Sequence, residues 1–137
     1  MARILCIDDD RDVLETCKII LTTEKHNVMM ALNGNEGFAK AKAEIPELIL
    51  LDVMMDDNTE GFHTAYKLRK DPVLKFVPIL MLTSVNQKLN MKCNPKKDGN
   101  FLPVDAFLEK PVEKVKLLKE VKRLLALKKD EINIDGN

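Results

Sequence analysis

Four groups of side chains that could bind a cation or a phosphoryl group follow short apolar segments of this sequence. Three consecutive acids, Asp8–Asp10, follow the first such segment, and Asp52 follows the segment 48–51. Thr83 and Lys110 follow two later apolar segments. Carboxylates that lie close together repel one another unless a positive charge lies among them, and Mg²⁺ prefers oxygen ligands. A pocket holding all four groups could bind Mg²⁺ and a phosphoryl group, with one carboxylate as nucleophile.

Short apolar segments alternate with longer amphipathic ones, which predicts alternating strands and helices. The predicted strands span 2–7, 28–32, 48–51, 79–82 and 104–108. Helices are predicted after an N-cap at Asp10 and over 35–44, 62–70 and 112–129, with a short helix and a loop in 84–102. This order predicts an α/β fold with a parallel sheet and helices on both faces. Because ligands bind beyond the carboxyl ends of strands in such sheets, the four groups should meet at one edge.

Composition predicts one globular domain without a strong bulk charge. The 137 residues include 22 basic and 22 acidic side chains, and 45% are apolar. The last predicted helix should bury Val115, Leu118, Val121 and Leu125 and turn its lysines to water rather than to nucleic acid. Three cysteines without metal-type spacing predict reduced thiols in a cytoplasmic protein, and neither a signal segment nor a membrane span is expected. We expect a domain over 1–129 and a frayed tail over 130–137.

The ordered set of motifs resembles the receiver domain of two-component response regulators from Arg3 to about Leu127. The matching motifs are Ile-Asp-Asp-Asp at 7–10, Leu-Leu-Asp-Val-Met-Met at 50–55, Leu-Thr-Ser at 82–84 and Glu-Lys-Pro at 109–111. The resemblance implies a flavodoxin-like sheet of order 2-1-3-4-5 with about five helices. It also implies a stand-alone, chemotaxis-type switch that receives its phosphoryl group from a sensor histidine kinase. Such a protein slowly hydrolyses its own aspartyl phosphate but is no turnover enzyme.

The resemblance implies roles for individual residues at the metal site. Asp52 would be the phospho-acceptor and would also ligate Mg²⁺. Asp9 and the backbone carbonyl of Met54 would complete the direct protein ligands, and Asp8 would act through a metal-bound water.

The resemblance also implies how the phosphoryl group is held and sensed. Lys110, expected before a cis bond to Pro111, would pair with phosphoryl oxygens, and Thr83 would hydrogen-bond to the bound group. Phe107 occupies the position of an aromatic switch residue that turns inward as Thr83 moves. An unidentified downstream protein would then dock on the face made by the fourth helix, the fifth strand and the last helix.

Three features depart from the family pattern. The loop after Asp52 lacks the usual proline and is about one residue longer, although Gly61 should still make the tight turn. The segment from Thr83 to Lys110 is longer by roughly five residues, and 84–102 is expected to be the most mobile part of the domain. Phe107 lacks the hydroxyl that many relatives carry, so it could pack but not hydrogen-bond.

Two alternatives remain open at this point. A haloacid-dehalogenase-type phosphatase would use Asp8 as nucleophile with Asp10, but the late acids Asp105 and Glu109 fit its metal site poorly and Asp52 has no role in it. A degenerate interaction module would need no phosphorylation, although every acid and the lysine of the pocket are present. Two histidines, His26 and His63, lie away from the predicted strand ends and are expected on the surface.

Overall fold

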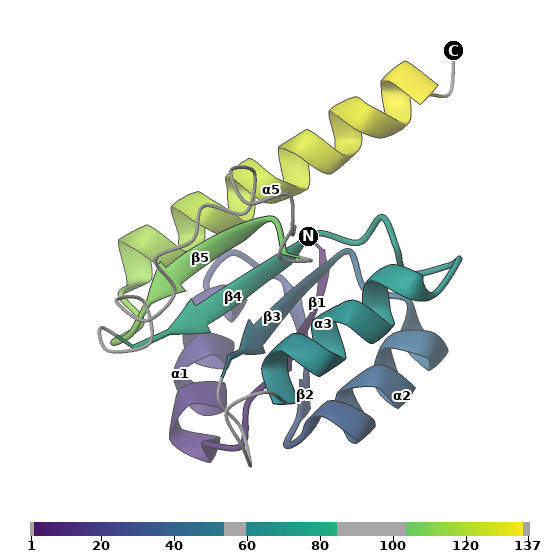
Figure 1. Ribbon diagram of the computed structural model, residues 1–137. Coiled ribbons are helices and arrows are strands. Elements are labelled where there is room, and N and C mark those ends of the chain that lie inside the picture. Colours follow the sequence, from purple (N-terminus) through teal and green to yellow (C-terminus); the bar gives the residue numbers. More distant parts are fainter. Residues whose placement is uncertain (1, 54–59, 85–103, 136–137) are drawn as a thin grey trace.

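The computed structural model describes residues 2–53, 60–84 and 104–135 as a parallel sheet covered by helices on both faces (Figure 1). The strands are β1 (Arg3–Ile7), β2 (Asn27–Ala31), β3 (Leu48–Asp52), β4 (Ile79–Thr83) and β5 (Ala106–Glu109). The helices are α1 (Arg11–Thr22), α2 (Gly34–Glu44), α3 (Glu60–Lys70) and α5 (Lys114–Asp135). All neighbouring strands pair in parallel, in the order β2-β1-β3-β4-β5. The predicted fold class and strand order are therefore confirmed.

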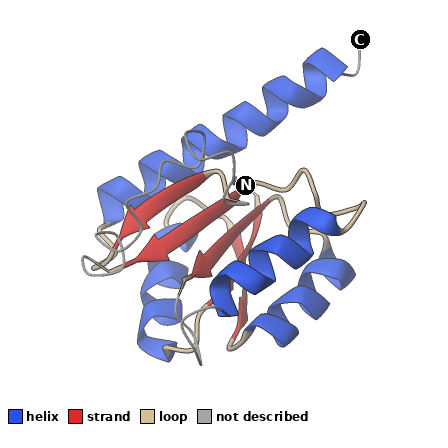
Figure 2. Cartoon of the chain, viewed as in Figure 1, coloured by secondary structure: helices blue, strands red, loops and turns tan. Residues whose placement is uncertain are grey.

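The three central strands are apolar except at their ends, because helices cover both of their faces (Figure 2). Successive side chains point to opposite faces of a strand, so each strand contributes to two separate cores. The core beneath α1 and α5 takes Ile4, Cys6, Leu48, Leu50, Leu80 and Leu82. The core beneath α2 and α3 takes Leu5, Ile7, Ile49, Leu51, Ile79 and Met81.

Side-chain caps set where the first two helices begin. Asp10, the predicted N-cap, accepts a hydrogen bond from the Asp12 N–H at 2.9 Å and starts α1 directly after β1. Asn33 caps α2 in the same way through the Glu36 N–H at 2.8 Å. Each cap satisfies a backbone donor that the helix leaves unpaired at its start. The chain can therefore leave the carboxyl end of a strand and turn at once into a helix.

The last helix differs from the prediction in its length and in its buried face. It continues to Asp135, past the predicted end near Lys129, because no glycine or proline interrupts the chain before Gly136. Val115, expected in the core, is 77% exposed. The buried residues Leu117, Val121 and Leu124 have the spacing of one helical face, and Leu118 and Leu125 pack beside them.

Some expectations concern residues outside the described ranges. The predicted short helix and loop in 84–102, and the mobility expected there, lie outside them. The described residues therefore form four helices rather than the expected five. None of these helices is both long enough and apolar enough to cross a membrane.

Gly61, in the first turn of α3, approaches the backbone at the end of β3. A Cβ atom on this residue would lie 2.4 Å from the Asp52 carbonyl oxygen and 2.5 Å from that of Val53. These are backbone atoms, so a larger side chain could be accommodated only if the strand end or the helix moved. The absence of a side chain at Gly61 thus lets α3 pack directly against the strand that carries Asp52.

We expect Gly61→Ala to destabilise the protein by about 1–3 kcal/mol, because the steric overlap outweighs the gain of roughly 1 kcal/mol that alanine brings to a helix interior. Urea unfolding followed by circular dichroism would measure the change. His63→Ala, at an exposed position of the same helix, serves as the control and should leave stability nearly unchanged. Equal stability of Gly61→Ala and wild type would show that the contact is not restrictive.

Candidate functional site

Three aspartates meet at the carboxyl ends of two neighbouring strands. Asp8 and Asp9 follow β1, and Asp52 is the last residue of β3. One carboxylate oxygen of each lies within 4.8 Å of the others. Asp8 is 1% exposed and Asp52 2%, whereas Asp9 is exposed. Such a group of oxygens, open to solvent on one side, suits a hard divalent cation that keeps some of its waters.

Lys110 brings a positive charge into this cluster from the end of β5. Its Nζ lies 2.9 Å from Asp52 Oδ1 and 3.3 Å from Asp8 Oδ2. Its backbone N–H donates to the Thr83 carbonyl oxygen at 2.6 Å, which ties the end of β5 to the end of β4. The peptide bond between Lys110 and Pro111 is cis, as predicted.

Burial and charge change the proton affinity of this cluster. Desolvation of Asp8, together with the negative charge of Asp52, raises the pKa of Asp8 from 3.8 to about 6. The backbone N–H of Asp10, which donates to Asp8 Oδ1 at 2.9 Å, and the ammonium of Lys110 both act in the opposite direction. For Lys110, burial lowers the pKa, but the hydrogen bond to Asp52 and the charges of both aspartates raise it by more. Lys110 therefore stays charged at neutral pH.

Two buried oxygen atoms of the site have no hydrogen-bond partner. Among the described residues, Asp8 Oδ2 and Thr83 Oγ1 are the buried side-chain polar atoms in this condition, although Lys110 approaches Asp8 Oδ2 as an ion pair. Buried polar atoms are nearly always paired, so each unpaired atom points to a ligand or a water. The Asp8 oxygen is an acceptor that fits a cation with its waters. The Thr83 hydroxyl is a donor that fits a phosphoryl oxygen.

The structure brings together most of the residues that the sequence analysis selected. Asp8, Asp9, Asp52 and Lys110 form one cluster, and Thr83 ends the strand between Asp52 and Lys110. Met54, the predicted carbonyl ligand, lies outside the described residues.

Phe107 pairs with Met81 across β4 and β5 and packs, half-buried, against the core beneath α2 and α3. By strand alternation it shares this face of the sheet with Thr83.

Other residues have roles that differ from those considered for them. Asp10 turns its carboxylate to the Asp12 N–H as a helix cap, which leaves the acid pair of the phosphatase alternative incomplete. His63 is exposed, as expected, but His26 is half-buried and accepts a hydrogen bond from the Ala2 N–H at 3.0 Å. An ion pair between Arg69 and Asp105 was not anticipated, because its partners lie 36 positions apart and no local pattern connects them.

We expect Asp8→Asn to stabilise the metal-free protein at pH 7.5, by on the order of 1–3 kcal/mol. The folded state holds the Asp8 proton more tightly than the unfolded chain does, so ionisation of this group opposes folding above pH 6. The stabilisation should therefore be complete above about pH 6 and should disappear as the pH falls toward 4.

Urea unfolding in EDTA at several pH values would measure this difference between variant and wild type. Glu44→Gln, which removes an exposed carboxylate, is the control and should show no such gain. A variant less stable than wild type at pH 7.5 would contradict the electrostatic account.

Comparisons with known proteins agree with this geometry. Residues 4–122 match the family model of the response regulator receiver domain. The chain is 32% identical over 126 residues to protein PilH of Pseudomonas aeruginosa, a match that covers 92% of this chain and 99% of PilH. It is also 32% identical to response regulator PleD of Caulobacter vibrioides, but there it spans only 27% of the relative.

A solved structure extends the similarity to three dimensions. The chemotaxis protein CheY4 of Vibrio cholerae superposes with a TM-score of 0.75 at 30% identity, covering 90% of this chain and 98% of CheY4. Receiver domains are phosphorylation-activated switches of two-component signalling, and they generally bind Mg²⁺ at an acidic pocket such as the one formed here by Asp8, Asp9 and Asp52. The family match, the strand order and the acidic edge of the sheet together show that this chain belongs to the response regulator receiver domain family.

Proposed function

We propose that the chain accepts a phosphoryl group on Asp52 from the phosphohistidine of a sensor kinase and signals through altered docking of a partner. The observation that carries this proposal is the contact of 2.9 Å between Lys110 Nζ and Asp52 Oδ1 beside two unpaired buried oxygens. Asp52 thus lies in a site that contains the ammonium group of Lys110 and two buried oxygens, Asp8 Oδ2 and Thr83 Oγ1, that have no hydrogen-bond partner.

The chemistry assigned to Asp52 is a nucleophilic substitution at phosphorus. A carboxylate oxygen of Asp52 would form the new P–O bond while the P–N bond to the kinase imidazole breaks. The ammonium of Lys110 would orient the carboxylate beforehand and then pair with a phosphoryl oxygen. Thr83 Oγ1, buried and without a partner, would donate to another oxygen once the group is attached. Attack by water would later release phosphate and restore the carboxylate.

Mg²⁺ is the cofactor we assign to the acidic cluster. Asp9 and Asp52 would be direct ligands with the Met54 carbonyl, and Asp8 would act through a bound water. When bound, the ion would offset the negative charge of the phosphoryl oxygens and of the acids. The buried Asp8 Oδ2, which accepts no hydrogen bond, supports an interaction of this kind.

The output surface we propose lies beside β5. Thr83 and Phe107 lie on neighbouring strands and on the same face of the sheet, so a movement of Thr83 toward the phosphoryl group would free space for Phe107. A partner would then bind the face formed by β5, α5 and the helix predicted within 84–102, which lies outside the described residues. The match to nearly the whole length of PilH and CheY4 supports a chemotaxis-type switch, and we propose that it acts in the cytoplasm.

We expect wild-type protein with Mg²⁺ and acetyl phosphate to gain one phosphoryl group on Asp52, and Asp52→Asn to gain none. Intact-mass and peptide mass spectrometry would locate the group. Asp12→Asn, which removes an exposed acid of α1, is the control and should label as wild type does. Labelling of Asp52→Asn equal to that of wild type would refute the assignment, and mass that turns over at Asp8 would favour the phosphatase alternative.

We expect Phe107→Ala to leave labelling of Asp52 nearly unchanged while reducing the structural response. In wild type, beryllofluoride with Mg²⁺ should change amide hydrogen exchange at the acid cluster and along 104–110, because Phe107 repacks. In the variant the second change should be smaller. Exchange that changes only around Asp8 and Asp52 in wild type would exclude the proposed output surface.

A further inference from the structure

The position of Lys110 depends on the register of a short edge strand. β5 has four residues and pairs only with β4, and Lys110 follows its last residue directly. The connection from 84 to 105 is too long to dictate the register in the way that a two-residue turn does. Something else must therefore decide which residues of β5 lie opposite β4.

Alternation of side chains excludes some registers but not all. A slip by one residue would turn every side chain of β5 to the opposite face, including the half-buried Phe107. A slip by two residues keeps each side chain on its face, but it would place Ala106 or Lys110 where the buried Leu108 now lies, so packing opposes it as well. Such a slip would carry Lys110 along the sheet by roughly 7 Å and remove its ammonium from Asp52.

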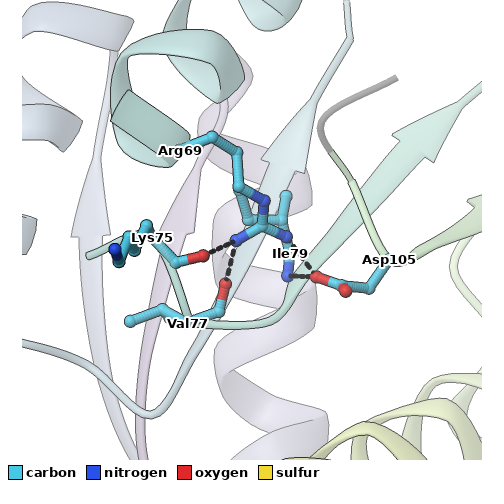
Figure 3. Close-up of polar contacts among 5 residues, drawn as sticks. All are labelled: Arg69, Lys75, Val77, Ile79 and Asp105. Carbon is cyan, nitrogen blue, oxygen red and sulfur yellow. Dashed lines mark hydrogen bonds and ion pairs between the residues drawn. The ribbon is translucent and has the colours of Figure 1, made fainter. Parts of the chain in front are cut away.

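Asp105 joins β5 to the start of β4 through its backbone and its side chain. Its N–H donates to the Ile79 carbonyl oxygen at 2.9 Å, and its Oδ2 accepts from the Ile79 N–H at 2.8 Å. Arg69 of α3 donates from Nη2 to the same carboxylate oxygen. Arg69 Nη1 also donates to the carbonyl oxygens of Lys75 at 3.1 Å and Val77 at 2.6 Å (Figure 3).

These contacts favour the observed register over those shifted by two residues. A shifted strand would place Pro103 or Phe107 where Asp105 now lies. Neither side chain accepts a hydrogen bond, and proline has no N–H for the Ile79 carbonyl. The Ile79 N–H and one arm of the Arg69 guanidinium would both lose their acceptor.

The chemistry of this network explains why an arginine holds it. A planar guanidinium can serve two backbone carbonyls and a carboxylate at once, whereas an ammonium offers no such fork. The Asp105 side chain is 42% exposed, and exposed ion pairs contribute little to overall stability. The main consequence of the network is therefore expected in the placement of β5 and not in the free energy of unfolding.

We propose that Arg69 and Asp105 are positioning residues for the phosphoryl site, which hold β5 in the register that places Lys110 against Asp52. The two ends of β5 are then fixed independently, by Asp105 on Ile79 at the start and by the Lys110 N–H on Thr83 at the end. This inference rests on the proposed roles of Asp52 and Lys110. It adds that contacts at the amino ends of β4 and β5 are needed to position Lys110 at the carboxyl ends of the strands.

Binding of beryllofluoride in the presence of Mg²⁺, followed by ¹⁹F NMR on the full chain, tests the proposal. Arg69→Gln and Asp105→Ala should weaken this binding at least about tenfold, because Lys110 is displaced. Mg²⁺ affinity should not fall, since the acids lie on β1 and β3 and a displaced ammonium no longer repels the cation. In a Lys110→Met background, Arg69→Gln should cause no further loss, an outcome that general destabilisation would not produce.

Two kinds of control variant distinguish displacement of Lys110 from a general loss of stability of the fold. Lys42→Gln removes the ion pair to Asp71, which joins α2 to the segment after α3 without contacting β5, and it should bind beryllofluoride as wild type does. Arg69→Lys and Asp105→Asn are milder variants for use if the first two unfold, and each variant is assayed at a temperature where it is folded.

Either of two binding results would overturn the proposal: unchanged beryllofluoride affinity in the folded variants, or an equal loss in the Lys110→Met background. Failure of wild type to bind beryllofluoride would instead count against the proposed function. The register itself can be followed without any ligand, through the nuclear Overhauser contacts between Ile79 and Asp105. Their retention in Arg69→Gln would likewise overturn the inference.

Discussion

Two buried carboxylates share one ammonium group at the carboxyl edge of the sheet, and this balance of charge governs the structure around it. Asp8 and Asp52 are nearly inaccessible to water, and Lys110 is within 3.3 Å of both. Burial of like charges side by side is unfavourable, as the raised pKa of Asp8 shows. The site therefore stores an unfavourable interaction that a bound cation would relieve. Because Asp8 and Asp52 repel each other before any ligand binds, the arrival of a new charge at the site changes the energy of this cluster strongly.

The rest of the fold supplies the stability that this cluster opposes. The central strands β1, β3 and β4 are buried on both faces, and their apolar side chains fill two cores. Parallel pairing brings all carboxyl ends to the same edge, so residues far apart in the chain meet there without any local contact between them. Gly61 allows α3 to pack against the backbone at the end of β3, close to Asp52.

The sheet fixes the positions of Asp8 and Asp52 more firmly than the position of Lys110. Asp8 follows β1 and Asp52 ends β3, two strands with neighbours on both sides, whereas Lys110 follows an edge strand of four residues. The lysine is thus the group whose position depends most on contacts outside the strand ladder. The hydrogen bonds that the Asp105 carboxylate accepts from Arg69 and from the Ile79 N–H at the start of β5 fit this need, because backbone pairing is nearly indifferent to a shift by two residues.

The sequence alone determined the class of fold, the strand order through the family resemblance, and the residues of the acidic cluster. These features depend on local signals: apolar periodicity, the cap at Asp10, and polar side chains placed directly after strands. Errors in the prediction arose where local signals were weak. Val115 and Leu117 are both apolar neighbours in one helix, and only packing against the sheet decides which of them is buried.

Tertiary structure alone decided the charge state and the long-range contacts. The raised pKa of Asp8 follows from burial beside Asp52, and no pattern in the chain encodes that distance. The pairing of Arg69 with Asp105 likewise joins segments 36 positions apart. Periodicity describes one element at a time, whereas such contacts arise only after the elements have packed together.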